Sequence, residues 1–442
     1  MNQDKIQEYC VNSFSRYWKN NRELISGLPI SSVVPEDVEL PVKLVSVKLP
    51  VWAKKYTISG CFLVPSEAAA NKWEDVNWWY VMYWYLHCLA ERKFESIYGP
   101  IHSYSYRLKG WDNRMWKHAW VNRIAMFLRL WVCKNEGKVP EILFPEKLEA
   151  EILLTHDLDA VSKTLVIRLK QCTFNVYNAI KLLGDRRLRD AVCKLKSAFQ
   201  FLLGTGGYWN FDKLGYDTDN SIIKKRIINV YGGGGGAFRS LKKIVVDPGY
   251  GLHNEKLVGE LNTLCNNGFV IGLHQSYDAW DDSSKMMKEK ITLEGYLGVR
   301  VLTCRQHWLK FSFLKTWVSQ AKSGFVEDTT LGFNDRVGFR NGAALRFSPI
   351  DMTGKFIGLE SVPMILMDSH LYDYNNLNSL EIDAEIDALI SEVELIKGQA
   401  SIIWHPHTLG SDYGWSDGFQ ALLERLGCIR KYTEEIEVDH DL

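Results

Sequence analysis

The sequence predicts an α/β protein in which a barrel or open sheet of parallel strands follows an aromatic-rich, mostly helical α+β region. Two observations predict this class. From about residue 151 onwards, short apolar runs recur between segments of helix length, and each run ends at a polar residue, as in (β/α) proteins. Before that point, more than half of the 16 tryptophans gather in residues 52–131. We therefore expect an N-terminal accessory domain over 1–145 and a barrel domain over 146–442.

The N-terminal region carries two segments, 73–92 and 117–134, with apolar side chains at helical spacing and charges on the opposite face. We interpret them as two packed helices whose aromatic side chains form a core. A platform that stacks sugar rings is the alternative. Because these aromatics exceed what one small domain buries, we expect residues 1–145 to pack on the barrel or on a second copy of the chain in a homo-oligomer.

Six apolar runs are expected to be buried parallel strands that carry functional groups at their carboxyl ends. They are residues 151–154, 243–246, 269–273, 299–302, 325–326 and 400–404. Between the first two runs, residues 161–230 show long basic patterns of helical period, so we expect a helical insertion there.

Charge and composition exclude several classes of protein. Lysine plus arginine and aspartate plus glutamate number 53 each, so no global field favours nucleic acid or an anionic membrane. We interpret the basic run at 185–189 as a solvated helix face. The first residues lack a secretory-signal pattern, and the most apolar stretch, 76–90, is too short and polar-edged to be a transmembrane segment. The 9 scattered cysteines include no Cys-x-x-Cys pair, which favours reduced thiols and a cytoplasmic location.

Ionisable side chains stand at the ends of these runs in a set order. They are Asp157 and Asp159, His274, Arg305 and His307, Asp328, and His405. Residues at i and i+2 of a strand share a face, so both members of each close pair can point to one mouth of the barrel. Carboxylates and imidazoles that converge there would suit zinc or another divalent first-row metal. A carboxylate left free of the metal could then act as a general base.

Five segments in this order resemble the motifs of the polysaccharide deacetylases (carbohydrate esterase family 4), in a bacterial branch with an Asp-x-Asp first motif. They are 155–159 (THDLD), 272–277 (GLHQSY), 305–308 (RQHW), 326–333 (VEDTTLGF) with 338–340 (GFR), and 402–405 (IIWH). The resemblance covers residue 151 to about residue 410. It implies a distorted (β/α) barrel of the polysaccharide-deacetylase type.

The resemblance also implies a role for the leading residue of each motif. Asp157 would be the catalytic base, and Asp159 and His274 would be metal ligands. Arg305 would orient the base, and His405 would be the general acid.

Substrate contacts are implied for side chains next to these groups. Ser276 and Tyr277 belong to the second motif, and Trp308 belongs to the third. Asp328 and Arg340 belong to the fourth region, which shapes the substrate groove in the family.

Two departures from the family pattern concern the metal. Leu158 separates the two aspartates, as the Asp-x-Asp branch tolerates, and Asp278 stands where a second histidine is usual. The third ligand is therefore open among His307, Asp278 and His156. We favour His307, because it can share a face with Arg305 at the barrel mouth.

The implied protein is a hydrolase that depends on a divalent transition metal, with Zn²⁺ as the first choice, and removes an N-acetyl or other N-acyl group from a sugar. Without an export signal, we expect a nucleotide-linked sugar, a lipid-linked sugar or an oligosaccharide from bacterial surface-polysaccharide biosynthesis. Two alternatives stay open because fold does not determine function. One is a degenerate barrel that binds glycan without hydrolysing it, and the other is a deformylase or amidase for another N-acyl substrate.

Overall fold

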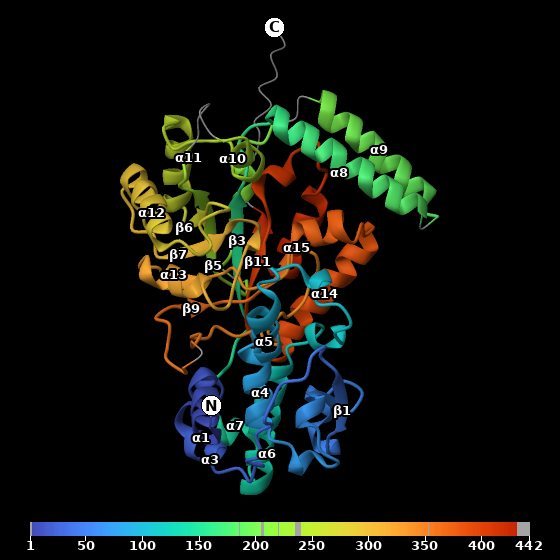
Figure 1. The fold of residues 1–442 in the computed structure, drawn as a ribbon, viewed down its shortest axis with the longest axis vertical. Coiled ribbons are helices and arrows are strands. Elements are labelled where there is room, and N and C mark those ends of the chain that lie inside the picture. Colours follow the sequence, from blue (N-terminus) through green and yellow to red (C-terminus); the bar gives the residue numbers. More distant parts are fainter. Residues whose placement is uncertain are drawn as a thin grey trace.

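Figure 1 shows the protein as a computed structural model, which describes residues 2–184, 186–204, 207–219, 221–234, 240–351 and 353–430. The main sheet lies at the centre, and the N-terminal helices lie at one end of the molecule. A pair of long helices, α8 and α9, projects at the side towards the other end. The predicted barrel domain extends to residue 442, and residues 431–442 lie outside the described part.

Eight strands of the described chain form the main sheet, and every neighbouring pair in it is parallel. Their order across the sheet is β10-β11-β3-β5-β6-β7-β8-β9. They are β3 (Glu151–Leu158), β5 (Ile223–Tyr231), β6 (Phe269–Gln275), β7 (Thr303–Gln306), β8 (Glu327–Asp328), β9 (Glu360–Ser361), β10 (Met364–Met367) and β11 (Gln399–Ile403). The predicted α/β class with a parallel sheet is confirmed.

The sheet curls until one chain segment joins both of its edges. β9 and β10 lie at opposite ends of the strand order, yet only Val362 and Pro363 separate them in sequence. On one side the Val362 amide donates to the Asp328 carbonyl (2.9 Å), and on the other the Pro363 carbonyl accepts from the Ser401 amide (2.8 Å). The result is a barrel with one distorted wall, which agrees with the barrel expected from the sequence.

Side chains alternate between the inside and the outside of this barrel. On β3, Leu154 belongs to the large cluster beneath the outer helices, whereas Leu153 packs with Ile227 and Val362 in a small separate cluster. Odd-numbered residues of β3 therefore face inwards and even-numbered residues face the helices. Asp157 accordingly faces the interior near the carboxyl end of β3.

The outer layer of the barrel is helical. Its helices are α8 (Leu165–Gly184), α9 (Leu188–Leu203), α10 (Leu241–Val246), α11 (Glu255–Asn266), α12 (Ser283–Leu297), α13 (Thr316–Lys322), α14 (Ser379–Leu395) and α15 (Ser416–Arg425). Short turns of helix shape the loops: η7 (Phe211–Leu214), η8 (His307–Leu309), the π-helical η9 (His370–Tyr374) and η10 (Pro406–Leu409). A small antiparallel pair consists of β4 (Tyr216–Asp217) and β12 (Ile429–Arg430).

One predicted strand, 243–246, is wrong, and the strand found in its place in the barrel was not predicted. Residues 243–246 belong to helix α10, which Ser240 caps by accepting a hydrogen bond from the amide of Lys243 (3.4 Å). A short apolar run does not by itself distinguish strand from helix. The second barrel strand is instead β5, which begins inside the range 161–230 that was expected to be a helical insertion and ends one residue beyond it. The first half of β5 carries charged side chains, which are unusual in a barrel strand, so the sequence pattern does not indicate a strand there. The fold accommodates Lys225 because it pairs with Glu327 (2.6 Å).

The other predicted strands are present with shifted ends. β7 begins at Thr303, after the predicted run 299–302, so Arg305 lies inside the strand and not beyond it. β8 likewise follows the predicted run 325–326. Neither β9 nor β10 is predicted from the sequence.

The N-terminal region is mostly helical. Its helices are α1 (Gln3–Ser13), α2 (Ser15–Trp18), α3 (Arg22–Ser26), α4 (Trp78–Leu86), α5 (Leu89–Tyr98), α6 (Trp120–Glu136) and α7 (Pro140–Leu143). Shorter turns are η1 (Lys19–Asn21), η2 (Val51–Tyr56), η3 (Ser66–Ala68), η4 (Trp73–Asp75), η5 (Ser105–Arg107) and η6 (Asn113–Trp116), and β1 (Leu44–Lys48) pairs antiparallel with β2 (Cys61–Pro65). Trp78, Trp79 and Trp84 are at most 1% exposed, so these aromatics form a core, as interpreted from their spacing.

This region and the barrel share one hydrophobic cluster, to which Trp317 of α13 belongs together with the N-terminal tryptophans. Two buried ion pairs cross the same boundary: Glu91–Arg340 and Arg123–Glu392. The N-terminal region therefore packs on the barrel, and self-association through it stays a prediction.

Candidate active site

A cavity of about 190 Å³ opens at the carboxyl ends of the barrel strands. Asp157 and Asp159 reach it from β3 and its following loop, and His274 reaches it from β6. His307 follows β7 directly, and His405 follows β11 after Trp404. Side chains that are distant in sequence meet here because the carboxyl ends of parallel strands share one end of a barrel.

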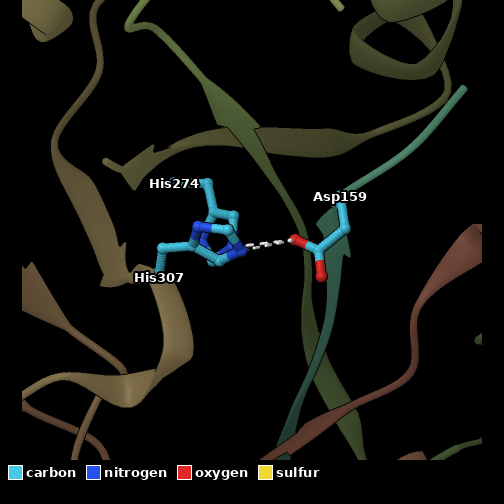
Figure 2. A group of neighbouring side chains, drawn as sticks. All are labelled: Asp159, His274 and His307. Carbon is cyan, nitrogen blue, oxygen red and sulfur yellow. Dashed lines mark hydrogen bonds and ion pairs between the residues drawn. The ribbon is translucent and has the colours of Figure 1, made fainter. Parts of the chain in front are cut away.

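Figure 2 shows Asp159, His274 and His307, three side chains that line this cavity. The Nε2 atom of His274 lies 3.1 Å from Oδ1 of Asp159, and the Nε2 atom of His307 lies 3.4 Å from the same oxygen. One potential ligand atom from each residue lies within 4.8 Å of the other two. Two imidazole nitrogens and a carboxylate oxygen form a donor set typical of zinc and related divalent metals.

A backbone carbonyl lies behind the His274 ring, and a carboxylate lies behind the His307 ring. Nδ1 of His274 donates to the Arg305 carbonyl (3.2 Å), and Nδ1 of His307 lies 3.5 Å from Oδ1 of Asp247. A histidine whose Nδ1 carries the proton presents the lone pair of Nε2, which is the arrangement that metal-binding histidines need. Directly after His307 the backbone turns sharply at Trp308, whose φ of 57° lies in the left-handed region.

Charge within the cluster shifts its pKa values. Burial opposes ionisation of Asp159, but the charge on His307 and the hydrogen bond from His274 outweigh it and hold the pKa of Asp159 well below its usual range. Burial likewise opposes protonation of His307, and the Asp159 carboxylate overcomes it and raises the pKa of His307. The residues therefore fit a divalent cation, which would replace the proton that now links them.

The structure brings His307 to Asp159 and His274, and it places the other two candidate ligands elsewhere. His156 points out of the barrel, where its ring nitrogens contact the Trp404 carbonyl (2.7 Å) and the Tyr216 hydroxyl (3.0 Å). Asp278 lies at the surface and pairs with Lys242 (3.0 Å).

Asp157 lies on β3, two residues before Asp159, and is 3% exposed. Asn229 of β5 donates to its Oδ1 (2.7 Å), and Nε of Arg305 lies 3.6 Å from the same oxygen. Within the described residues, no hydrogen bond reaches Oδ2, which leaves that oxygen to accept a proton in the cavity. Arg305 is fully buried, and the described residues give its two terminal nitrogens no hydrogen-bond partner. A buried guanidinium in this state needs a countercharge, which Asp157 supplies together with the more weakly interacting Asp328.

His405 forms a second acid–base unit with Asp368, which follows β10. Nδ1 of His405 lies 2.8 Å from Oδ1 of Asp368, and the His405 amide donates to the other oxygen (2.9 Å). Burial alone would lower the pKa of His405, but the Asp368 carboxylate outweighs it and raises the pKa to about 10. His405 therefore carries a proton at neutral pH, with its Nε2 3.6 Å from Oδ2 of Asp159. The neighbouring His407 is the opposite case, because burial lowers its pKa to about 4.

Of the five residues expected to contact substrate, Trp308 lines the cavity. Ser276 is buried and donates to Glu289, and Tyr277 lies beneath the ammonium of Lys310, which is 4.0 Å from its ring.

The two residues from the fourth region hold the fold together. Asp328 is fully buried and accepts hydrogen bonds from Trp317 (3.0 Å) and Gln320 (2.9 Å). Arg340 pairs with Glu91 of the N-terminal region and is 2% exposed. Neither side chain is among the described residues that line the cavity.

Several residues of the site are not predicted from the sequence. Asn229 lies on the strand that was expected to be helical, and Asp247 follows a helix that was expected to be a strand. Asp368 ends the apolar run of β10, so the rule that predicts the other strand-end residues would have found it. Lys170 and Phe174 reach the cavity from α8, which the sequence analysis places in an insertion.

In comparisons with known proteins, no family model and no curated protein matches the sequence. Solved structures that resemble the fold include a Mycobacterium smegmatis protein named as a polysaccharide deacetylase. Its TM-score is 0.36 and its identity 14%, over 64% of this chain and 85% of its own. Agd3, named as a novel carbohydrate deacetylase, has a TM-score of 0.34 and 10% identity over 70% of this chain, which spans about half (54%) of Agd3. These scores are too low for either likeness to bear on function.

Proposed function

We propose that the protein is a metal-dependent hydrolase that removes an N-acetyl or other N-acyl group from a sugar. The observation that carries this proposal is the arrangement of one cavity. A three-residue donor set, a carboxylate held by a buried arginine, and a protonated histidine held by a buried aspartate all face it. Amide hydrolysis needs an electrophile, a base and an acid in these relative places.

Asp159, His274 and His307 would hold the metal, with Zn²⁺ as the first choice from the donor set. A divalent metal at this place supplies Lewis acidity, which polarises a carbonyl and makes a water molecule more acidic. Asp247 and the Arg305 carbonyl fix the two imidazole rings, so that both Nε2 atoms point to the same place.

Asp157 acts as the base in this mechanism. It accepts a proton from the attacking water as the water oxygen adds to the acyl carbon. Asn229 and Arg305 both engage Oδ1, so they fix the plane of the carboxylate and leave Oδ2 to take the proton.

His405 acts as the acid. When the C–N bond of the amide breaks, the nitrogen takes a proton from Nε2 of His405, and acetate and an amino sugar leave with one water consumed. Asp368 keeps this imidazole protonated and turned towards the cavity. Trp308 at the cavity wall offers an aromatic face for a sugar ring. A nucleotide-linked sugar, a lipid-linked sugar or an oligosaccharide from bacterial surface-polysaccharide biosynthesis would be the substrate.

Acetate release from a panel of N-acetylated sugars tests the proposal, with wild type compared with Asp157→Asn. We expect wild type to lose activity in chelator and regain it with zinc. We expect Asp157→Asn to be slower by about a hundredfold to ten-thousandfold, because it cannot accept the water's proton. Its metal content should match that of wild type, because Asp157 is not a ligand.

Asp278→Asn, at a surface carboxylate paired with Lys242, is the matched control and should keep wild-type activity. Thermal melts verify that loss of the countercharge to Arg305 has not unfolded the variant. An Asp157→Asn protein that is folded and fully active would refute the assigned base. An inactive wild type that binds no zinc would favour a glycan-binding barrel.

A further inference from the structure

The helical hairpin formed by α8 and α9 exposes an apolar stripe on its first helix. Leu165, Leu169, Val176, Ile180 and Leu183 recur at spacings of three, four or seven residues, so they lie on one face of α8. Their exposed fractions run from 37% to 67%. Side chains at this spacing are normally buried against a neighbour.

The second helix repeats the pattern. Leu188, Val192, Leu195, Phe199 and Leu203 lie on one face of α9 and are 40% to 74% exposed. We call these two stripes together the outer face of the hairpin. Monomeric soluble proteins rarely expose a contiguous apolar surface of this extent, so the outer face indicates a binding surface.

The outer face points away from the rest of the protein, because other residues of the hairpin make the internal contacts. Asn178 donates to the Asp373 carbonyl (3.2 Å) and Lys194 to the Tyr372 carbonyl (2.9 Å). The two helices contact each other through a small cluster of their own: Ala179, Leu182 and Ala191. In Figure 1 the hairpin projects from the side of the barrel.

Charge on the hairpin selects the kind of partner. Residues 163–203 contain five lysines, four arginines and two aspartates, a net charge of +7, whereas the whole chain has a net charge of +0. Lys163 pairs with Asp412 of the barrel, whereas Arg189 and Lys196 are exposed on α9 and available to a partner. A second copy of the chain would bring a second set of positive charges to the same interface, which like-charge repulsion disfavours. An anionic lipid bilayer offers both an apolar layer and negative headgroups.

The hairpin lies on such a surface and does not cross it. Among the helices that the structure describes, none is long and apolar enough to span a membrane. Amphipathic helices with basic side chains and with leucine and phenylalanine on the opposite face bind at the headgroup boundary of a bilayer.

The same hairpin forms part of the cavity wall. Lys170, Gln171 and Phe174 of α8 line the cavity, and the Lys170 ammonium lies 4.2 Å from the ring of Trp308. A bilayer that covers the outer face would therefore contact the same helix whose other side lines the candidate active site.

We propose that the outer face of the α8–α9 hairpin docks on an anionic bilayer and that the sugar substrate is carried on a lipid in that bilayer. The docking stands on the hairpin alone, whereas the substrate class rests on the proposed function. The hairpin holds the cavity at headgroup level, where the sugar of a lipid-linked saccharide lies.

Vesicle flotation tests the docking. We expect wild type to float with vesicles of phosphatidylglycerol and phosphatidylcholine and not with phosphatidylcholine alone. Leu195→Gln/Phe199→Gln should lower binding at least about tenfold, because each side chain loses the gain from leaving water. Arg189→Gln/Lys196→Gln should also lower binding to the anionic vesicles, because two positive charges that attract the headgroups are removed.

Ile291→Gln/Leu380→Gln is the matched control, since it changes two apolar residues that are 59% and 81% exposed on α12 and α14. It should float as wild type does. Circular dichroism verifies that all variants keep their helices. Wild type that fails to float, or hairpin variants that float unchanged, would overturn the docking. A wild-type dimer that Leu195→Gln/Phe199→Gln splits, with no flotation, would assign the outer face to a second copy instead.

Acetate release tests the substrate class. Wild type is given an N-acetylhexosamine linked to a lipid diphosphate in anionic vesicles, and separately the corresponding nucleotide sugar in solution. We expect release from the lipid-linked sugar, and Leu195→Gln/Phe199→Gln should slow it at least about tenfold. Release from the nucleotide sugar alone would overturn the lipid-linked class. Flotation without release from any sugar would overturn the proposed function and leave the docking intact.

Discussion

Among single residues, the surroundings of His307 and Asp278 indicate which of the two would be the third metal ligand. His307 is 6% exposed, lies 3.4 Å from Asp159 and has Asp247 behind its ring. Asp278 is engaged with Lys242 at the surface. A donor that is both buried and oriented by a carboxylate costs little further entropy when it binds a metal.

We therefore expect His307→Ala to weaken zinc binding by more than about a hundredfold, since even a group that only orients a ligand contributes about tenfold to a hundredfold. Asp278→Ala should bind zinc as wild type does. Calorimetric titration with zinc at fixed pH measures both. If Asp278→Ala loses zinc binding and His307→Ala keeps it, the assignment of the third ligand is reversed. His307 would then be a charged side chain of the cavity that does not bind the metal.

At the scale of single elements, strand β6 carries Gly272 for a reason that the neighbouring strand explains. Asn229 of β5 is the register partner of Asp157 on one side and of Gly272 on the other, and its amide nitrogen donates to Asp157 while its Oδ1 lies against the glycine. A Cβ at position 272 would lie 2.1 Å from Oδ1 of Asn229 and 3.1 Å from Cγ2 of Thr303. Only a residue without a side chain leaves room for the donor that holds the proposed base.

Gly272→Ala should therefore lower the free energy of unfolding by about 1–3 kcal/mol through overpacking and lower the deacylation rate. Adding Asn229→Ala relieves the clash, so the double variant should regain stability but stay slow, because Asp157 then lacks its donor. Urea unfolding and acetate release measure the two effects. Gly259→Ala, in α11 with open space around its Cβ, is the matched control. A Gly272→Ala enzyme with wild-type rate would show that Asn229 does not position Asp157.

At the scale of the whole molecule, the N-terminal region is tied to the barrel through Glu392 of α14. Nε of Arg123 donates to Glu392 (2.7 Å), and His118 lies 3.2 Å from the same carboxylate. Burial would raise the pKa of Glu392, but the hydrogen bonds from His118 and Arg123 outweigh it and lower the pKa to about 2. A carboxyl with a depressed pKa stabilises the folded state above its ordinary pKa and loses that contribution as pH falls through the folded value.

We expect Glu392→Gln to lower the free energy of unfolding by about 3–5 kcal/mol at neutral pH, because Arg123 is then left buried without a countercharge. The difference from wild type should shrink as pH falls from the ordinary value of 4.5 towards about 2. Urea unfolding at several pH values measures it. Glu394→Gln on the same helix removes a surface pair with Arg425 and should cost at most about 1 kcal/mol. Equal effects of the two variants would show that the buried pair does not hold the two regions together.

The α/β class, the parallel strands and the order of the polar residues at their ends follow from local pattern, because hydrophobic period and strand-end polarity are written within short windows. On that basis Asp157, Asp159, His274, Arg305 and His405 are predictable as one group. The helix at 243–246 and the charged strand β5 are not predictable in this way. A short stretch of sequence does not show which distant residue will neutralise a charge or which residue will cap a helix.

Local sequence pattern therefore identifies the donors at the strand ends, whereas contacts in the folded protein set how these donors combine. The position of His307 beside Asp159 and His274, and the ion pair and hydrogen bonds of Arg340 and Asp328 in the core, depend on contacts between residues far apart in the chain. The exposure of the α8–α9 outer face is of the same kind. An apolar stripe on a helix has the same residue spacing whether or not a neighbouring element covers it. The sequence therefore does not show that this stripe is exposed, whereas the packing of the folded protein does.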